Sequence, residues 1–314
     1  MGITPQSRPK TGIIAGWGRF PIEVAEELRR QGHELFIVCL KGHASSELEN
    51  LATDHRWLGV AKMGAQFRYL KRCAVQQVAF AGKIFKDKVL HHGNRHLSNL
   101  PDLTCYRVVW QSLITRSKDA RDDTLLMAVV DFYNQRGIEV LPIQRVAPNL
   151  LAEDGFLSRR KPNRRENIDI SFGWQTAKQM GALDVGQSIT VKDQMVLGVE
   201  AIEGTDALIQ RTAALCPRGG FTLIKLAKPE QDMRFDVPTI GVRTVEQLAR
   251  AGGKVIAIEA NKTLIVERQA TLKAAQRHGI AIVSMNSEKA SCLNGSSSSN
   301  ASIPNEPDMR TRAA

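Results

Sequence analysis

The pattern of apolar and polar positions at the start of the chain predicts a strand, a loop, a helix and a second strand. An apolar run over 11–16 ends in glycine, which is typical of a buried strand that turns sharply. Apolar residues then recur at helical spacing from Ile22 to Leu28, after Pro21, a residue that the first turn of a helix tolerates. A second apolar run covers 34–40. Together these positions predict a βαβ unit.

The alternation of strand and helix patterns continues as far as residue 146. We predict a strand over 77–81, a helix over 119–134 with one apolar face, and a returning strand over 138–141. Strands that alternate with helices favour a parallel sheet covered by helices. The pattern therefore predicts an N-terminal α/β domain over 11–146, built on a Rossmann-like parallel sheet.

A change of composition separates this domain from a second one. Residues 147–167 contain prolines and a run of basic residues, which predicts a linker. Residues 168–285 return to apolar periodicity and predict a mixed α/β domain, whereas 286–314 are rich in serine and asparagine and predict a disordered tail. The elements expected in the second domain are a helix over 168–180, paired strands over 188–191 and 195–199, a helix over 205–215, strands over 221–226, 237–242, 255–259 and 280–283, and helices over 244–251 and 268–278.

Composition narrows the class of protein. The chain has 314 residues, of which 43% are hydrophobic and 24% charged, as expected for two globular domains. It has no signal-peptide pattern and no apolar run long enough to span a membrane, so we expect a cytoplasmic protein. The five cysteines are scattered without metal-binding spacing. The net charge of +11 favours anionic partners, although the aromatic content of 5% is low for a protein that stacks nucleic-acid bases.

The glycine-containing loop after the first strand only partly matches a dinucleotide-binding fingerprint. Gly16 and Gly18 would let backbone N–H groups approach an anion at a helix N-terminus, but Pro21 stands where a third glycine is expected. No acidic residue follows the second strand at Lys41, where a nicotinamide cofactor would need one. A tight strand-to-helix turn explains the glycines equally simply.

Three acidic residues surround the predicted start of the helix at 205. Thr205 could cap this helix, and Asp206 would suit its first turn. Capping does not account for Glu200 and Glu203, which place two more carboxylates beside the same turn. Such a cluster would suit a bound cation or the hydroxyl groups of a sugar.

The densest group of charged residues lies between two predicted strands, from 225 to 241. Two lysines, Lys225 and Lys228, Arg234 and two aspartates, Asp232 and Asp236, lie there within twelve residues. Cations can neutralise the non-bridging oxygens of a pyrophosphate, and an aspartate can hold a divalent metal or orient water. The other interpretation is a solvated loop with surface ion pairs, which contribute little energy.

At this segment the sequence resembles a known family. The pattern Lys-x-x-Lys-Pro-x-Gln-Asp-x-Arg-x-Asp-x-Pro-Thr-Ile-Gly, from Lys225 to Gly241, is similar to the signature of LpxI-type UDP-2,3-diacylglucosamine pyrophosphatases. The opening GIIAGWGRFP, the Phe-Ala-Gly at 80–82 and the stretch 184–206 agree in order and spacing, so the resemblance covers about 11–285. Trp17 and the absence of a proline after Gly82 depart from the pattern.

The resemblance implies hydrolysis of UDP-2,3-diacylglucosamine to 2,3-diacylglucosamine 1-phosphate and UMP, assisted by Mg²⁺ and performed between two α/β domains. By its match to the signature, Asp236 is predicted to be essential, as a metal ligand or to orient water. We infer from the chemistry that Lys225, Lys228 and Arg234 are candidates to clamp the pyrophosphate. The other candidates are Gly16, Gly18, Gly82, Thr205, Thr239 and Gly241 for substrate binding, and Glu203 and Asp206 with Asp236 for the metal.

The partners implied are a UDP-linked diacylated sugar and, because the chain is basic, the surface of the inner membrane, with no nucleic acid. A homodimer is compatible with the sequence. Two alternatives belong to other classes. A nucleotide-dependent oxidoreductase would use the Gly16 loop, and a basic module for nucleic acid would show steeply salt-dependent binding without hydrolysis.

Overall fold

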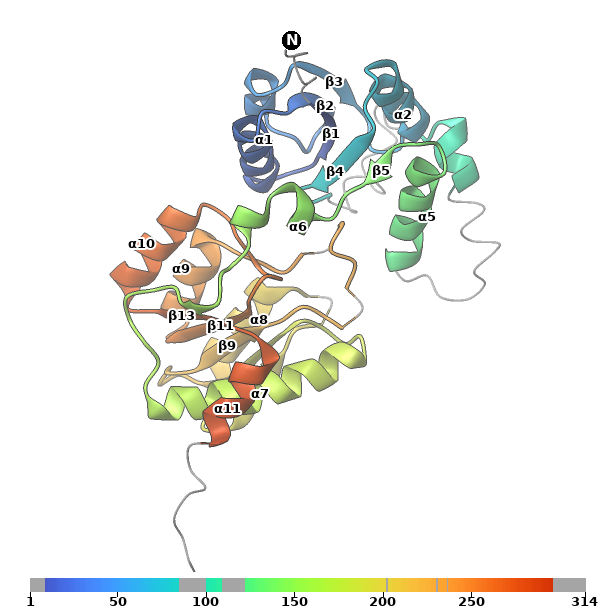
Figure 1. Cartoon of the computed structure of the whole chain (residues 1–314). Helices are drawn as coiled ribbons and strands as arrows, with labels where there is room; N and C mark the ends of the chain where they lie inside the picture. Colours follow the sequence, from blue (N-terminus) through green and yellow to red (C-terminus); the bar gives the residue numbers. More distant parts are fainter. Residues whose placement is uncertain are drawn as a thin grey trace, which may run out of the picture.

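The computed structural model describes residues 9–84, 100–108, 122–201, 203–229, 231–235 and 237–295. These residues form two α/β units, and the N-terminal unit is at the top in Figure 1. The chain passes from one unit to the other through α6, Ile143–Val146, and the short 3-10 helix η4, Pro148–Leu150. The predicted fold class of two α/β domains is confirmed.

The N-terminal unit contains a five-stranded parallel sheet in the order β3-β2-β1-β4-β5. The order steps outward from β1 in both directions, which is the arrangement of a doubly wound, Rossmann-like sheet. Its strands are β1 (Lys10–Ala15), β2 (Glu34–Leu40), β3 (Asp54–Leu58), β4 (Gln77–Ala81) and β5 (Glu139–Val140). Its helices include α1 (Phe20–Arg30), the 3-10 helix η1 (Ser46–Asn50), α2 (Met63–Arg72) and α5 (Asp122–Asn134).

Neighbouring residues of β1 serve two separate cores. Ile13 packs with Ile22 and Leu28 of α1, on one face of the sheet. Ile14 packs on the other face with Leu70 of α2 and Tyr133 of α5. Successive side chains of a strand point to opposite faces, so a continuous apolar run such as that of β1 requires helices on both sides.

The pattern of the sequence does not predict β3 and α2. Strand β3 reads Asp-His-Arg-Trp-Leu from Asp54 and lies at the edge of the sheet, where its polar residues remain accessible. It pairs in parallel with β2 throughout its length. Backbone pairing with a buried neighbour therefore determines this strand, rather than an apolar pattern of its own.

The C-terminal unit contains a six-stranded mixed sheet in the order β6-β13-β11-β9-β7-β8. Strands β9, β11 and β13 are parallel, whereas β7 is antiparallel to both β8 and β9. The strands of this sheet are β6 (Gly155–Phe156), β7 (Ser188–Lys192), β8 (Met195–Val199), β9 (Thr222–Lys225), β11 (Val255–Glu259) and β13 (Ala281–Met285). A separate parallel pair consists of β10 (Thr239–Ile240) and β12 (Leu264–Ile265).

Helices cover both faces of the C-terminal sheet. One face packs against α7 (Arg164–Ala182) and α11 (Ser287–Gly295), which contribute Trp174 and Ala290 to its core. The other face packs against α8 (Thr205–Leu215), α9 (Val242–Arg250) and α10 (Arg268–His278). Strands β8 and β9 flank β7 and end at the same edge of this sheet. The segments that follow them contain most of the predicted site residues.

Part of the predicted linker 147–167 is regular structure. Strand β6 adds to the C-terminal sheet beside β13, and α7 begins at Arg164 rather than at the predicted residue 168. The Asn163 side chain accepts the Glu166 N–H at 2.9 Å, and a Glu166 carboxylate oxygen accepts the Asn163 N–H at 2.8 Å. This capping box fixes the start of the helix.

The prediction of disorder for 286–314 is wrong over residues 287–295. These residues form α11, and the Asn286 side chain accepts the Lys289 N–H at 2.9 Å, as an N-terminal cap does. Ala290 is buried against α7. The sequence of α11 has no clear apolar periodicity, so its pattern of residues does not predict a helix. Its packing against α7 through Ala290 stabilises it instead. Residues 296–314 lie outside the described residues.

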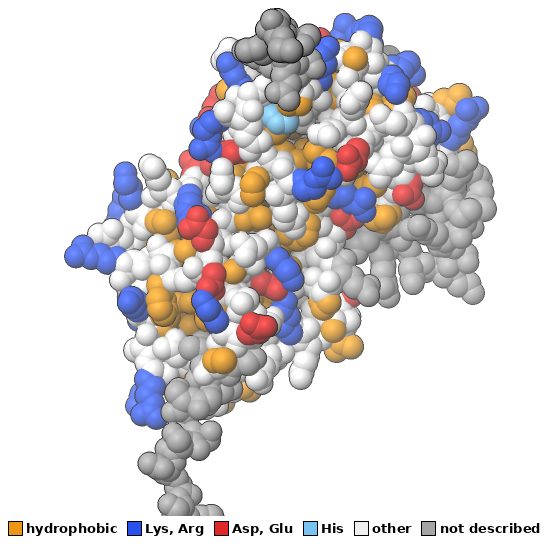
Figure 2. Space-filling model, in the orientation of Figure 1, with side chains coloured by type: hydrophobic (Ala, Val, Ile, Leu, Met, Phe, Trp, Pro, Cys, Tyr) orange, Lys and Arg blue, Asp and Glu red, His pale blue; other side chains and the backbone are white. Residues whose placement is uncertain are grey.

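Charges of both signs are interspersed over the face of the molecule shown in Figure 2. Apolar side chains gather on the same face around the junction of the two units. Within the part of the chain that the structure describes, no helix has both the length and the apolar character needed to cross a bilayer.

The buried position of Ala290 can be tested by introducing a charge. We expect Ala290→Asp to destabilise the C-terminal unit by about 3 kcal/mol, because the carboxylate would lose its hydration without gaining a partner. Cys292→Asp places the same charge at an exposed position of the same helix and is the control. Thermal unfolding of both variants would measure the difference, and equal midpoints would contradict the packing of α11.

Candidate active site

The topology of the C-terminal sheet brings the ends of β8 and β9 to one edge. Because β7 lies between them and is antiparallel to both, β8 and β9 run in the same direction. Glu200 follows β8, and Lys225 is the last residue of β9. Ser188 connects the two: its carbonyl accepts the Glu200 N–H at 2.8 Å, and it pairs in register with Lys225.

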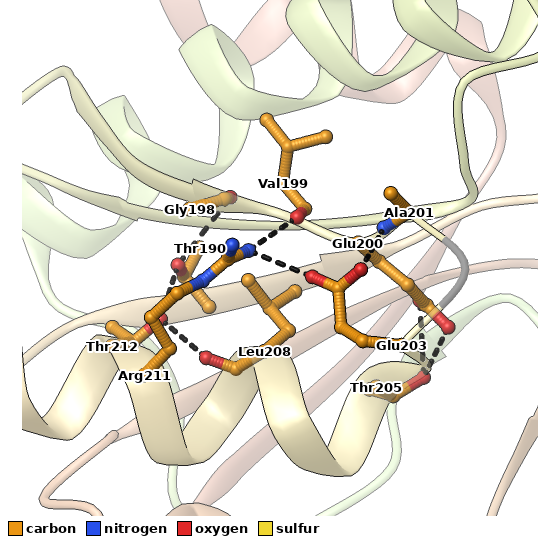
Figure 3. A network of polar contacts seen from close by, with 10 residues as sticks. All are labelled: Thr190, Gly198, Val199, Glu200, Ala201, Glu203, Thr205, Leu208, Arg211 and Thr212. Atoms are coloured by element: carbon orange, nitrogen blue, oxygen red, sulfur yellow. Dashed lines mark hydrogen bonds and ion pairs between the residues drawn. The ribbon is translucent and has the colours of Figure 1, made fainter.

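Glu200, Thr205 and Lys225 form a hydrogen-bonded chain at this edge. The Thr205 hydroxyl oxygen lies 3.1 Å from each carboxylate oxygen of Glu200, and it accepts a hydrogen bond of 2.9 Å from the Lys225 ammonium. Figure 3 shows Glu200 and Thr205 facing each other at the start of α8. Glu200 and Lys225 are each only 7% exposed. The hydroxyl therefore links a buried anion to a buried cation.

The prediction that Thr205 caps α8 is wrong. The capping position belongs to Gly204, at φ 84°, and no side-chain hydrogen bond caps the helix. Thr205 is the first residue of the helix, and its hydroxyl donates to Glu200 instead. A partner outside the helix thus determines the orientation of this side chain.

The other two acidic residues near the start of α8 have basic partners of their own. Glu203 pairs with Arg211 at 2.9 Å and accepts the Ala201 N–H at 3.0 Å, contacts that Figure 3 shows. Backbone hydrogen bonds, assisted by Arg211, lower the pKa of the Glu203 carboxyl. Asp206 pairs with Arg243 at 2.7 Å.

The predicted metal candidates Glu203 and Asp206 pair with two different arginines in this structure. No group of three or more histidine, cysteine, aspartate or glutamate side chains placed to hold a metal occurs among the described residues. Asp236, the third metal candidate and the predicted catalytic residue, lies outside the described residues. A metal role for Glu203, Asp206 and Asp236 therefore stays a prediction from the sequence.

The loop between β9 and β10, residues 226–238, is here called the charged loop. Its two described cations have separate partners. Lys228 contacts Asp184 at 2.7 Å, at the end of α7. Arg234 forms a fork with Asp232, at 2.8 Å from its Nε to Oδ1 and 2.6 Å from its Nη2 to Oδ2. The structure thus places Lys225, Lys228 and Arg234 on one stretch of chain but directs each to a different carboxylate or hydroxyl.

The fork changes the acid–base properties of both its members. Burial alone would raise the pKa of the Asp232 carboxyl, but hydrogen bonds from the side chain and backbone of Arg234 outweigh burial and lower it. The hydrogen bond to Asp232 raises the pKa of Arg234 in turn. Both groups therefore stay charged, and the guanidinium is held in a fixed orientation.

The charged loop also contacts the N-terminal unit. The Phe235 ring packs against Phe80 of β4, with ring centroids 4.8 Å apart. The Met233 carbonyl accepts the Ile143 N–H at 3.3 Å, and an Arg234 nitrogen lies 3.2 Å from the Met127 sulfur. The loop therefore spans the junction between the units, where the sequence predicts the ligand.

The two glycines at the carboxyl ends of β1 and β4 are explained by close packing. The Gly16 N–H donates to the Ala81 carbonyl at 2.8 Å, and Trp17 and Lys83 exchange hydrogen bonds of 2.8 and 3.0 Å. An added Cβ on Gly16 would lie 2.7 Å from the Lys83 carbonyl oxygen, and one on Gly82 would lie 2.7 Å from Pro21. The N–H groups of Gly16 and Trp17 thus bind the protein itself, and the predicted approach of the Gly16 N–H to an anion is not what this structure shows.

The remaining predicted binding residues have local roles. Gly18 adopts φ 110°, in open space, as a sharp turn requires. The Thr239 hydroxyl donates to the Val237 carbonyl at 2.8 Å, and Gly241 precedes α9, where its carbonyl accepts the Val245 N–H. The backbone angle of Gly18 and the hydrogen bond of Thr239 explain these two residue types without a ligand, whereas the extended backbone of Gly241 would accept other residues. A binding role for the three residues stays a prediction.

Sequence reasoning missed Glu259, at the end of β11. Its carboxylate is buried, pairs with Lys178 at 2.8 Å, and accepts the Ala227 N–H at 3.1 Å. It therefore fixes the start of the charged loop. The available signal was an acidic residue ending the otherwise apolar strand Val-Ile-Ala-Ile-Glu.

A second contact joins the two units away from the charged loop. A Glu23 carboxylate oxygen in α1 accepts the Glu267 N–H at 2.6 Å, at the start of α10. Burial raises the pKa of Glu23. Leu264 of the C-terminal unit also packs into the core around α1.

Comparison with known proteins identifies the same family that the sequence signature resembles. The LpxI N-terminal domain family matches residues 10–150, and the LpxI C-terminal domain family matches 153–283. The UDP-2,3-diacylglucosamine pyrophosphatase LpxI of Caulobacter vibrioides is 31% identical over 287 residues, which cover 89% of this chain and 99% of that protein.

Among solved structures, the biotin carboxylase domain of the Hydrogenobacter thermophilus 2-oxoglutarate carboxylase is similar with a TM-score of 0.26 and 9% identity. The similarity covers 60% of this chain and 36% of that one. A likeness at this level supports no conclusion about fold or function.

Removing the Thr205 hydroxyl tests the buried chain of hydrogen bonds. We expect Thr205→Val to destabilise the C-terminal unit by about 2 kcal/mol, because Glu200 and Lys225 each lose a buried partner. Thr176→Val removes a hydroxyl that, within the described part of the chain, donates to the Phe172 carbonyl of its own helix, and it serves as the control. Chemical denaturation measures both, and an equal loss in the two variants would contradict the linking role of Thr205.

Proposed function

The chain belongs to the LpxI family, and we propose that it hydrolyses the pyrophosphate bond of UDP-2,3-diacylglucosamine, in lipid A biosynthesis. The products would be 2,3-diacylglucosamine 1-phosphate (lipid X) and UMP. The proposal rests on one observation: this chain matches a UDP-2,3-diacylglucosamine pyrophosphatase over nearly the whole length of both proteins. The charged loop at the junction of the two units supports it on chemical grounds.

The substrate's anhydride carries negative charge on its non-bridging oxygens, and that charge must be balanced as water attacks phosphorus. Water attacks one phosphorus of the anhydride and breaks its bond to the bridging oxygen. The attacked phosphate keeps the oxygen of water, and the other phosphate leaves with the bridging oxygen. Lys225, Lys228 and Arg234 are the cations that we assign to the pyrophosphate. Each contacts an oxygen of the protein at 2.6–2.9 Å, so each is positioned before substrate arrives. Such pre-orientation is the main protein contribution to phosphoryl transfer.

We propose Mg²⁺ as the cofactor, with Asp236 as its candidate ligand. Glu203 and Asp206, the other predicted ligands, pair with Arg211 and Arg243 in this structure and would have to exchange those partners to bind the metal. Mg²⁺ commonly keeps several waters and binds one or two carboxylates together with substrate phosphates. A site of that kind needs few protein ligands, and the bound metal would supply Lewis-acid stabilisation of the phosphate charge.

The first test is hydrolysis itself. We expect purified protein to release UMP from UDP-2,3-diacylglucosamine in the presence of Mg²⁺ and to lose activity with a chelator. We expect Asp236→Asn to lower kcat by at least about 10²-fold, since either role proposed for the carboxylate requires its charge. Mass analysis of the products and circular dichroism of the variant would be measured together.

The control is Asp193→Asn, at the turn between β7 and β8, where the positive φ of 49° suits asparagine. It should leave kcat unchanged. A folded Asp236→Asn protein with full activity would remove the assigned role, and absence of UMP release by the unaltered protein would refute the proposed function.

We also propose that the protein works in the cytoplasm at the surface of the inner membrane, where its diacylated substrate would reside. With a net charge of +11, each basic residue near an anionic leaflet would contribute about 1 kcal/mol of attraction. We expect co-sedimentation with vesicles containing phosphatidylglycerol at low salt and release at high salt. No binding at low salt would be evidence against this location.

A further inference from the structure

The turn that ends α7 departs from the residues that such a turn normally contains. The Val185 N–H bonds to the Met180 carbonyl and the Asp184 N–H to the Gly181 carbonyl, the pattern of a Schellman motif. Glycine usually occupies the left-handed position of this motif, but here Asp184 holds it at φ 57°. Leu183 and Val185 on either side are 76% and 46% exposed.

This turn is held between two parts of the candidate active site. On one side, the Asp184 carboxylate contacts the Lys228 ammonium of the charged loop at 2.7 Å. On the other side, Gly186 lies so close to the backbone of Glu200 that an added Cβ would overlap the Glu200 carbonyl oxygen. The exposed residues Leu183 and Val185 therefore flank the residue that holds Lys228, one of the cations assigned to the pyrophosphate.

Exposure of one large apolar side chain is common and needs no explanation. Met195 and Leu215 are also 65% and 61% exposed, but Met195 begins β8 and Leu215 ends α8, at the opposite ends of these elements from Glu200 and Thr205. The distinguishing feature of Leu183 and Val185 is thus their position next to Lys228. Residues that do not suit their local structure, such as an aspartate at a position that favours glycine, are typical of functional sites.

We propose that Leu183 and Val185 form a contact site for an acyl chain of the substrate, on the rim of the active site. The inference rests on the proposed function, because it takes the substrate to be a diacylated sugar phosphate. A ligand of that kind presents hydrocarbon within a few bonds of its phosphate. A protein surface that binds it needs apolar side chains next to a phosphate-binding cation, and this turn provides that combination. Asp184 positions Lys228, while its neighbours receive the chain.

The test measures how the acyl-chain length of the substrate affects activity in the unaltered protein and in variants of the turn. The substrates are UDP-2,3-diacylglucosamines with acyl chains from short to long, dispersed in detergent, and the measured quantity is kcat/KM. We expect kcat/KM of the unaltered protein to rise with chain length. We expect Leu183→Ser and Val185→Ser each to lower it about tenfold for the longest chains and little for the shortest. Leu215→Ser and Met195→Ser remove equally exposed apolar side chains elsewhere and should have no effect.

Two results would overturn the acyl contact. An equal loss for all chain lengths would mean that the turn acts only by positioning Lys228, and no loss at any length would mean that the chains bind elsewhere. A loss that appears only with substrate in vesicles would indicate contact with the bilayer surface instead, and would also overturn it.

The same chain-length series can be measured by equilibrium binding, which needs no turnover. If the unaltered protein released no UMP, the proposed function would fail. The acyl contact would then be judged by binding alone. A chain-length preference that Leu183→Ser abolishes supports the contact, and the absence of such a preference refutes it.

Discussion

Two buried side chains of opposite charge at one edge of the C-terminal sheet determine the arrangement of the candidate site. An unpartnered charge in such a place costs several kcal/mol, so Glu200 and Lys225 need polar partners with good geometry. Thr205 contacts both, and its hydroxyl can do so only where the end of β8, the start of α8 and the end of β9 converge. The antiparallel strand β7 creates that convergence, because it lets β8 and β9 run in the same direction.

The charged loop leaves this edge and reaches the other unit, which places its cations at the junction. Glu259 fixes its beginning through the Ala227 N–H, and Phe235 fixes its far part against Phe80. Between these two points, Lys228 and Arg234 are each held by a carboxylate. The loop is therefore anchored at several points, although it has no regular secondary structure in its described part. Anchoring of this kind lets a loop present charges in fixed positions to a phosphate.

The sequence predicted the buried strands well, because a continuous apolar run such as that of β2 or β11 is typical of a strand covered on both faces. It could not predict β3 and α11, whose residues lack a clear pattern and whose structure depends on pairing with β2 or packing against α7. The charged residues of the site were visible as types, but their partners were not. Asp184 is 44 residues from Lys228 along the chain, and Thr205 was assigned to a helix cap because capping is the local use of its hydroxyl.

The antiparallel bridge between Trp17 and Lys83 has a consequence for how the two units are oriented. It ties the segment after β4 to the residues just before α1, and Glu23, one turn into that helix, accepts the backbone N–H that opens α10 in the other unit. A displacement of the chain at Gly82 would therefore shift the N-terminus of α1 and, through Glu23, the angle between the units. A single antiparallel bridge outside the named strands thus links the conformation of a turn in one unit to a contact between the two units.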